Sequence, residues 1–237
     1  MELHDHGDHK VVRNTIDGQE IFFTIRHEID VIQRHHQKGN FYEPEEISTM
    51  AAHIPEGATI MDIGTNVGNH ALWFAKYKAA QKIYVFEPNP EVLKVLRSNI
   101  ALNGIEGQLV TEFLGIGLAD KAAGGFRIQA AEKNLGGGRM FVGGGDLEVR
   151  AGDDVVAPGD KIDFIKIDVE RMELLVLAGL KETIARCRPP IFVEVDVNHM
   201  DDFRTWLEEN RYSVETTYQR SKRNINHMCL PETPAEA

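Results

Sequence analysis

The sequence predicts an α/β fold in which a mostly parallel sheet carries helices on both faces. From residue 58 to residue 104, apolar runs of strand length alternate twice with runs of helical spacing. This alternation is typical of strand–helix–strand units, which build parallel sheets covered on both sides. The chain has 237 residues, 42% of them hydrophobic, which is enough for one sizeable core, so one main domain is expected.

Residues 1–55 are expected to form a polar tail, a β-hairpin and a helical cap in front of the main domain. Two extended apolar runs flank Asp17-Gly18, a dipeptide that suits the type I′ turn of a hairpin. Apolar residues recur with helical spacing over residues 28–38 and 45–53, and a proline stands at the start of the second run. These helices are expected to cover the domain that follows.

Residues 56–220 are expected to form the main domain, and residues 221–237 a C-terminal tail. The predicted strands cover residues 58–64, 82–88, 108–116, 125–130, 163–169, 190–196 and 212–218, and the predicted helices cover residues 69–79, 91–102, 173–186 and 201–210. The segment from Asn134 to Asp146 carries six glycines in two triplets, which indicates a mobile loop over the acceptor or a disordered surface insertion. In the first interpretation, Arg139 anchors an anionic group of the substrate.

The charge balance and the cysteine content narrow the function. The chain has 26 Lys and Arg against 37 Asp and Glu, a net charge of −11, and no long basic run, so no nucleic-acid partner is expected. No run approaches the roughly 18 apolar residues of a membrane span, and the N-terminus lacks the features of a signal peptide. The two cysteines suit neither a metal site nor a disulfide framework, so we expect a cytoplasmic protein.

The segment IMDIGTNVGN, residues 60–69, forms the first predicted strand-to-helix turn of the main domain. In an open parallel sheet, ligands lie beyond the carboxyl ends of the strands, near the N–H groups of such a turn. The dinucleotide fingerprint G-x-G-x-x-G is absent here. Asp62, before the turn, is a poor neighbour for a pyrophosphate but a good partner for the ammonium group of an amino acid.

Glu87 stands 25 positions after Asp62, at the end of the second predicted strand, where a carboxylate could accept hydrogen bonds from both hydroxyls of a ribose. Taken alone, the glycines of the turn could permit only a tight bend, and Glu87 could be a solvated strand end. Their joint spacing favours a ligand that combines adenosine with an amino acid. We therefore expect S-adenosylmethionine as the cofactor and S-adenosylhomocysteine as the product, with a small molecule as the acceptor.

The sequence also resembles a known family, the FkbM-type S-adenosylmethionine-dependent methyltransferases. Four segments are similar to successive motifs of that family: MDIGTNVGNHALWFA, YVFEPNPEVLKVLRSNIALNG, IDFIKIDVERMELLVLAGL and RPPIFVEV. The resemblance covers about residues 41–196. It implies the class I methyltransferase fold, a Rossmann-like, seven-stranded, mostly parallel sheet whose last strand is antiparallel. It also implies methyl transfer to hydroxyls of sugars or secondary metabolites.

The resemblance further implies a set of cofactor contacts. The residues that match the cofactor turn are Asp62, Gly64, Thr65, Asn66, Gly68 and Asn69. The residues that match the ribose site and the positions beside it are Glu87, Pro88 and Asn89. Tyr42 and Glu45 lie in NFYEPEE, which is similar to the segment that closes over the methionine end of the cofactor. Asp168 lies at the strand end beside the methyl donor.

Four side chains at the same edge of the predicted sheet are candidate catalytic residues. A hydroxyl acceptor has a high pKa, so a general base, or a metal ion that acidifies the hydroxyl, should speed the transfer. Asp168 and Glu170 follow one strand and are the first choices, and Glu194 and His199 follow the next. Two neighbouring acids could raise one another's pKa or jointly hold a divalent cation, although no metal site is predicted. His199 could equally be a surface residue at a helix start.

Arg171 departs from the FkbM pattern, which usually has glycine at this position because glycine fits a turn that a side chain makes difficult. Its guanidinium could pair with Glu170 or Glu173, bind a carboxylate or phosphate of the substrate, or have no function. The basic run over residues 218–227 could receive a phosphorylated acceptor, or it could simply be solvated.

Together these features predict an S-adenosylmethionine-dependent O-methyltransferase that acts on a hydroxyl of a sugar, a sugar nucleotide or a glycosylated small molecule. Two alternatives stay open. An N-methyltransferase on the same fold would share the cofactor site, and so would a cofactor-binding protein that has lost catalysis. The sequence predicts neither the methylated position nor the oligomeric state.

Overall fold

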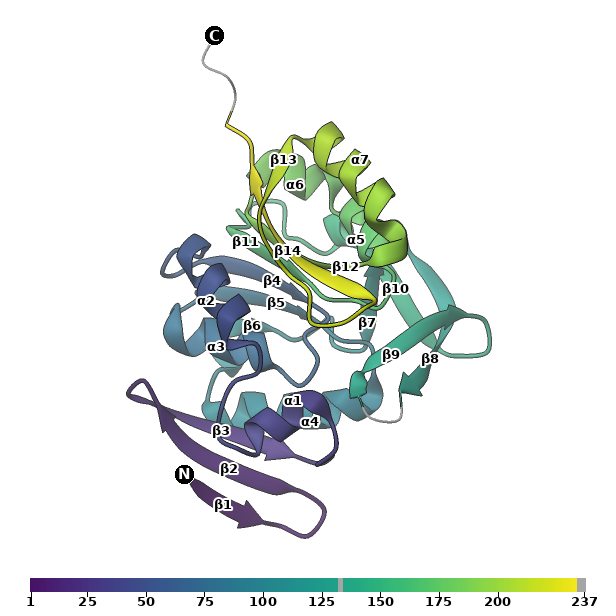
Figure 1. Cartoon of the computed structure of the whole chain (residues 1–237). Coiled ribbons are helices and arrows are strands. Elements are labelled where there is room, and N and C mark those ends of the chain that lie inside the picture. Colours follow the sequence, from purple (N-terminus) through teal and green to yellow (C-terminus); the bar gives the residue numbers. More distant parts are fainter. Residues whose placement is uncertain (132–133, 234–237) are drawn as a thin grey trace.

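The computed structural model describes residues 1–131 and 134–233, and its centre is a seven-stranded sheet (Figure 1). In chain order its strands are β4 (Thr59–Ile63), β5 (Lys82–Phe86), β6 (Leu109–Val110), β11 (Phe164–Ile167), β12 (Ile191–Asp196), β13 (Tyr212–Tyr218) and β14 (Asn224–Pro231). Their order across the sheet is β13-β14-β12-β11-β4-β5-β6. The pairs from β12 to β6 are parallel, whereas β14 is antiparallel to both of its neighbours. The predicted α/β fold is confirmed, with a sheet that is mixed rather than wholly parallel.

Helices cover both faces of this sheet (Figure 1). One face carries α2 (Pro44–His53), α3 (Asn69–Tyr77) and α4 (Pro90–Asn103), and the other carries α5 (Glu173–Gly179), α6 (Lys181–Cys187) and α7 (Met200–Asn210). Successive residues of a strand point to opposite faces, so Ile60 packs in one apolar cluster and Met61 in the other. In the part of the chain that the structure describes, no helix is both long and apolar enough to cross a membrane.

The single helix predicted over residues 173–186 is instead two helices, α5 and α6, which meet at Leu180. Gly179, the last residue of α5, lies so close to Ala119 that an added Cβ would be 1.9 Å from the Ala119 carbonyl oxygen. Because glycine also weakens a helix, the break falls where this close contact is made. Short 3₁₀ helices occupy three other connections: η1 (Glu106–Gln108), η2 (Gly152–Asp154) and η3 (Val197–His199).

The N-terminal segment forms a three-stranded antiparallel sheet, followed by α1 (Val31–His36). Its strands are β1 (Glu2–Asp5), β2 (Lys10–Ile16) and β3 (Gln19–Ile25). The predicted hairpin is confirmed, since Asp17 and Gly18 have φ values of 46° and 81°, as a type I′ turn requires. The expected polar tail is wrong for residues 2–5, which pair with β2 as a third strand.

Two asparagines of α4 attach the N-terminal sheet to the main domain. Asn99 accepts a hydrogen bond from the Thr24 N–H at 2.7 Å and donates one to the Val67 carbonyl at 2.7 Å. Asn103 accepts from the Phe22 N–H at 2.9 Å. These bonds satisfy backbone groups of β3 that have no strand on that side, so the N-terminal sheet is held on α4 next to the turn that precedes α3.

A second sheet of four strands, ordered β7-β10-β8-β9, lies beside the carboxyl edge of the main sheet (Figure 1). Its strands are β7 (Ile116–Ala119), β8 (Ala123–Ala131), β9 (Asn134–Val142) and β10 (Leu147–Ala151). Two expectations are therefore wrong. Residues 108–116 are not one strand but contribute to β6 and β7 in different sheets, and residues 134–142 are not a loop but a strand paired with β8. The glycine-rich segment forms a regular strand because it pairs with β8 along its length.

The expected C-terminal tail is also wrong for residues 224–231, which form β14 between β12 and β13 (Figure 1). The four consecutive residues from Asn226 to Cys229 are buried, as a strand with neighbours on both sides requires. The antiparallel direction of β14 follows from the short turn after β13, because such a connection joins antiparallel strands. This turn, residues 219–223, lies at the carboxyl edge of β12.

Asn99→Leu should destabilise the protein by about 2–4 kcal/mol, because it leaves the Thr24 N–H and the Val67 carbonyl unpaired in the interior. Asn210→Ala is the control, since the Asn210 side chain bonds only within its own helix, to the Trp206 carbonyl, among the described residues. Urea unfolding gives both free energies. Equal effects of the two variants would contradict the role assigned to Asn99.

Candidate active site

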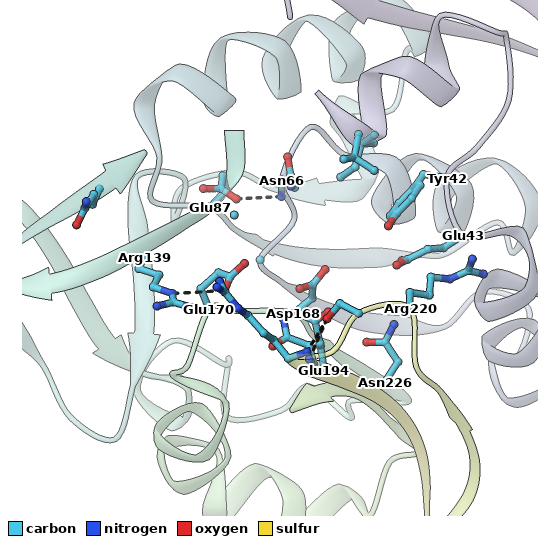
Figure 2. Close-up of a pocket in the computed structure, with 18 of the residues that line it drawn as sticks. Tyr42, Glu43, Asn66, Glu87, Arg139, Asp168, Glu170, Glu194, Arg220 and Asn226 are labelled. Atoms are coloured by element: carbon cyan, nitrogen blue, oxygen red, sulfur yellow. Dashed lines mark hydrogen bonds and ion pairs between the residues drawn. The ribbon is translucent and has the colours of Figure 1, made fainter. Parts of the chain in front are cut away.

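A cavity of about 560 Å³ opens at the carboxyl ends of β4, β5, β11 and β12 (Figure 2). Most of its wall is polar. Its lining residues are Val31, Ile32, Tyr42, Glu43, Gly64, Asn66, Glu87, Gln129, Gly137, Arg139, Phe141, Asp168, Glu170, Glu194, Arg220, Ser221, Arg223, Asn224 and Asn226. The cavity therefore lies where the strand order reverses, between β4 and β11, which is the usual ligand position in such sheets.

Gly64 sets the floor of this cavity. It has a φ of 77°, and a Cβ there would lie 1.8 Å from the Asp168 carbonyl oxygen, so no other residue fits without a shift of the backbone. Asn66, also in the left-handed region with a φ of 52°, points its N–H at Glu87, at 3.0 Å from Oε2. Gly68 has a φ of 89° and begins α3. The two glycines and Asn66 thus bend the backbone around the cavity floor.

Glu87 lies between the main cavity and a smaller one. Its carboxylate accepts hydrogen bonds from the Asn66 N–H and, at 2.8 Å, from the Asn89 N–H. Burial raises the pKa of Glu87 to about 7, although these two hydrogen bonds act in the opposite sense. The orientation of the carboxylate is fixed by the backbone, and its other lone pairs face the cavities.

The smaller cavity, about 50 Å³, is largely apolar. Its apolar lining comes from both sheets: Ile63, Phe86, Pro88, Leu118, Ile128, Met140, Val169 and Met172. Pro88 and Asn89 line it as well, next to Glu87. The sequence did not reveal this cavity, because Ile128 of β8 and Gly138 and Met140 of β9 line it, and the pairing of these strands is not visible in the local pattern.

Asp62, predicted as a cofactor residue, is not among the residues that line the cavity. It is fully buried beneath the turn, and one of its oxygens lies 3.2 Å from Nζ of Lys166. Lys166 also donates to the Gly64 carbonyl at 2.8 Å and lies 3.6 Å from Asp168. Burial by itself would lower the pKa of Lys166, but the charges of Asp62 and Asp168 raise it above its ordinary value. Asp62 therefore acts on the site through Lys166.

Thr65 and Asn69 are buried as well and hold the turn from within, so neither contacts the cavity directly. Thr65 Oγ1 donates to the Asp62 carbonyl at 2.7 Å. The Asn69 side chain accepts from the Tyr42 N–H at 2.8 Å and donates to the Tyr42 carbonyl at 3.1 Å. Asn69 thus positions Tyr42, which does line the cavity as expected.

Glu43, rather than the predicted Glu45, points into the cavity beside Tyr42 (Figure 2). Burial raises the pKa of Glu43 to about 8, with further contributions from the charges of Asp168 and Glu46. Glu45 lies outside, with 74% of its side chain exposed. The helix that begins at Pro44 explains this difference. Glu43 stands before the helix with a φ of 58°, whereas Glu45 lies in its first turn. The helix start was predicted, but this turn of the backbone was not.

Three acids from neighbouring strands meet at the floor of the cavity: Asp168, Glu170 and Glu194 (Figure 2). Burial and the charges of Asp168 and Glu170 raise the pKa of Glu194 to about 9. The neutral form of Glu194 is therefore favoured, and the nearby charge of Asp168 contributes to this effect. Oε2 of Glu194 accepts a hydrogen bond from Asn224 Nδ2 at 2.8 Å. Burial raises the pKa of Glu170 too, and Nε of Arg139 lies 4.0 Å from it.

Two of the predicted site residues lie outside the cavity. His199 Nδ1 is 2.8 Å from the buried Glu173, at the far side of β12, so it does not reach the acids at the floor. Arg171 donates from Nε to Asp196 at 2.8 Å, and not to either predicted partner. Arg171 has a φ of 66°, which is the turn conformation that a glycine at this position would favour.

The basic run over residues 218–227 divides between the cavity and the core. Arg220 and Arg223 line the cavity, together with Ser221, Asn224 and Asn226, none of which the sequence had singled out. His227 is buried instead, 5.2 Å from the ring of Phe203, and burial lowers its pKa to about 4. Across residues 1–131 and 134–233, no three His, Cys, Asp or Glu side chains are arranged to hold a metal ion.

Solved structures with this fold include several methyltransferases. The chain is similar to methyltransferase FkbM from Methylobacillus flagellatus KT at 16% identity and a TM-score of 0.50, over 72% of this chain and 43% of that one. It is similar to M. capricolum TrmK in complex with S-adenosyl-homocysteine at 13% identity and a TM-score of 0.50, over 78% and 67%. An rRNA methylase from Streptococcus thermophilus gives 12% identity and a TM-score of 0.50, over 80% and 95%. The fold is therefore that of methyltransferases.

The family follows from the sequence itself, since the model of the methyltransferase FkbM domain matches residues 62–214. The chain belongs to the FkbM family of S-adenosylmethionine-dependent methyltransferases, as the resemblance had predicted. It spans 43% of the length of the Methylobacillus protein. A search of curated protein sequences returned no significant match.

The free energy of unfolding should fall as the pH rises from 7 to 9. The pKa values of Glu43 and Glu194, about 8 and about 9, exceed the ordinary 4.5, so the folded protein retains protons that the unfolded chain has lost, and a higher pH favours unfolding. Urea unfolding at both pH values measures the fall. Glu194→Gln should make it smaller, whereas Glu45→Gln, at an exposed residue, should leave it unchanged. An equal fall in all three proteins would contradict this assignment.

Proposed function

We propose that the protein is an S-adenosylmethionine-dependent O-methyltransferase acting on a hydroxyl of a sugar, a sugar nucleotide or a glycosylated small molecule. The observation that carries this proposal is the acid pair Asp168–Glu194, which faces a polar cavity next to the turn at Gly64. In this arrangement a carboxylate is available to a hydroxyl beside the place where the fold positions a cofactor.

The two cavities fit the cofactor in one direction. The apolar lining of the smaller cavity would face one side of an adenine ring, and Glu87, between the cavities, would bind the two ribose hydroxyls. The amino-acid end then extends along Gly64 toward Tyr42 and Glu43. A bound ammonium group would favour the ionised form of Glu43 and lower its pKa. In this orientation the sulfonium methyl faces the floor of the large cavity.

The acceptor half of the large cavity suits a molecule with many hydroxyl groups. The acids Glu170 and Glu194, the amides of Asn224 and Asn226, and Arg139 offer both donors and acceptors there. An aromatic side chain, Phe141, adds an apolar surface at 39% exposure. Such a mixture of polar groups with one ring is suited to a small polar molecule with an apolar face.

The transfer is an in-line displacement. When bound, S-adenosylmethionine would supply an electrophilic methyl group, and its carbon–sulfur bond would break as the acceptor oxygen bonds to the methyl carbon. The hydroxyl proton becomes strongly acidic as the carbon–oxygen bond forms, and Asp168 accepts it. Glu194 keeps its proton and holds Asp168 in place, while Asn224 fixes Glu194. Alignment and exclusion of water supply the rest of the rate enhancement.

TrmK and the rRNA methylase act on RNA, but two features favour a small acceptor here. The chain has a net charge of −11, and acids dominate the cavity floor, so a polyanion would be repelled. An N-methyltransferase and a protein that binds the cofactor without transfer stay as the competing outcomes of the experiments below.

Glu43→Gln should weaken binding of S-adenosylhomocysteine by about tenfold or more, because an ammonium group loses a charged partner. Wild-type affinity should rise from pH 6 to pH 8, since ionised Glu43 binds the ammonium and its pKa in the empty site is about 8. Calorimetric titration measures both. Glu45→Gln, outside the cavity, should change affinity less than about threefold. A larger effect at Glu45 than at Glu43 would reverse the assignment.

Incubation with S-adenosylmethionine and a panel of sugars, nucleotide sugars, glycosides and amines tests the transfer, with mass spectrometry for one added methyl group. We expect products only from hydroxyl acceptors. Asp168→Asn should lower kcat by about 10²–10⁴, the usual contribution of a general base. Glu194→Gln should lower it far less, because glutamine can replace the donor of a protonated Glu194. A methylated amine would select the N-methyltransferase, and cofactor binding without any product would favour the non-catalytic protein.

A further inference from the structure

Three side chains of α2 bond to the segment that surrounds the turn after β13. Glu46 pairs with Arg220, Thr49 hydrogen-bonds to Tyr218 at 2.5 Å, and His53 lies 2.7 Å from Glu215. Because these α2 residues are three or four positions apart, they share one face of the helix. The contacts hold the end of β13 against the cap, so the turn at residues 219–223 lies over the end of the cavity that contains Tyr42 and Glu43 (Figure 2).

Arg220 is fixed by Glu46 but keeps donors free. Nε and Nη2 bond to the carboxylate of Glu46, which is fully buried, and Nη2 lies 2.6 Å from Oε2. Nη2 is also 3.3 Å from Glu45. Within residues 1–131 and 134–233, Nη1 has no hydrogen-bond acceptor. The Arg220 side chain is 42% exposed and lines the cavity, so an anion in the cavity can reach it.

The charge of Arg220 acts on the cofactor end of the cavity. Burial raises the pKa of Glu43, and the positive charge of Arg220 opposes that effect. The described lining contains two other arginines: Arg223, on the same turn as Arg220, and Arg139, which lies beside Glu170 on the other side of the floor (Figure 2). Glu43 and Arg220 therefore place a carboxyl group and a positive charge side by side, next to Tyr42. They lie opposite Glu87, where the ribose is expected.

We propose that Arg220 binds the α-carboxylate of the cofactor's amino acid through Nη1, while Glu46 holds the guanidinium in place. This inference rests on the proposed function, since it assumes a cofactor of that structure. The amino-acid end of S-adenosylmethionine carries an ammonium and a carboxylate on one carbon, so it needs an anion and a cation next to each other. Glu43 and Arg220 meet that need, because they offer an anion and a cation beside one another in the cavity wall.

The proposal assigns the turn after β13 to the cofactor site. Arg220 lies beyond residues 62–214, the part of the chain that matches the family model, and its partner Glu46 lies before it. The cofactor carboxylate would thus be held by an ion pair between two segments that are 174 positions apart in the sequence. An arginine suits this position because its planar group can bond to Glu46 and to a second carboxylate at the same time.

Two ligands that differ only in the carboxylate test the proposal by calorimetric titration. S-adenosylhomocysteine carries the group, and its decarboxylated analogue, 5′-deoxy-5′-(3-aminopropylthio)adenosine, keeps the ammonium but lacks it. Arg220→Met should weaken binding of S-adenosylhomocysteine by about 10- to 100-fold and binding of the analogue by less than about threefold. Lys222→Met, at an exposed neighbour outside the described cavity lining, should change neither. Arg220→Lys keeps the charge in case the methionine variant unfolds, and it should lose part of the preference for S-adenosylhomocysteine.

The results separate the proposal from its premise. An equal loss for both ligands, or no loss for either, in both Arg220 variants would overturn the proposal, since Arg220 would then be structural or idle. Unchanged cofactor affinity with a raised KM for a charged acceptor would also overturn it and assign Arg220 to the acceptor. If the wild-type protein bound neither ligand, the proposed function itself would fail, and this inference with it.

Discussion

The site depends on one buried charge, the ammonium group of Lys166. Its side chain is 2% exposed, and an isolated charge at such a position would be strongly unfavourable. Asp62 at the end of β4, the Gly64 carbonyl and Asp168 after β11 surround it within 3.6 Å. Because the ammonium needs these partners together, it holds the ends of two adjacent strands and the first turn in one arrangement. Gly64 and Asp168, which Lys166 contacts from below, form part of the cavity floor.

Three other acids of the site favour their neutral forms. Glu43, Glu87 and Glu194 have pKa values of about 8, 7 and 9 because burial and mutual repulsion favour their neutral forms. S-adenosylmethionine would bring two positive charges, an ammonium and a sulfonium, into this environment. Both charges would favour the ionised forms of these acids, so the acids would supply counter-charges when such a cation binds.

The sequence correctly predicted which residues lie at the carboxyl edge of the sheet. It did not predict which of them line the cavity and which are buried beneath it. Gly64, Asn66, Glu87, Asp168, Glu170 and Glu194 line the cavity as the strand ends indicated. Asp62, Thr65 and Asn69 belong to the same motif and are buried beneath it, because periodicity gives the face of a strand and not how far a side chain lies from the ligand. Arg139 was found as a cavity residue, although the expected loop around it is a strand.

What the sequence could not predict arises from contacts between distant segments. The pairing of β8 with β9 brings Ile128 and Met140 to the smaller, apolar cavity, and the insertion of β14 brings Ser221, Asn224 and Asn226 to the wall of the larger one. Neither event leaves a local pattern, since glycine triplets and a short basic run read as loops and tails. These additions surround a common cofactor turn from three sides. The turn at Gly64 forms the cavity floor, whereas the second sheet, the cap and the last hairpin form the remaining walls, so most of the wall comes from segments that lie outside the motifs.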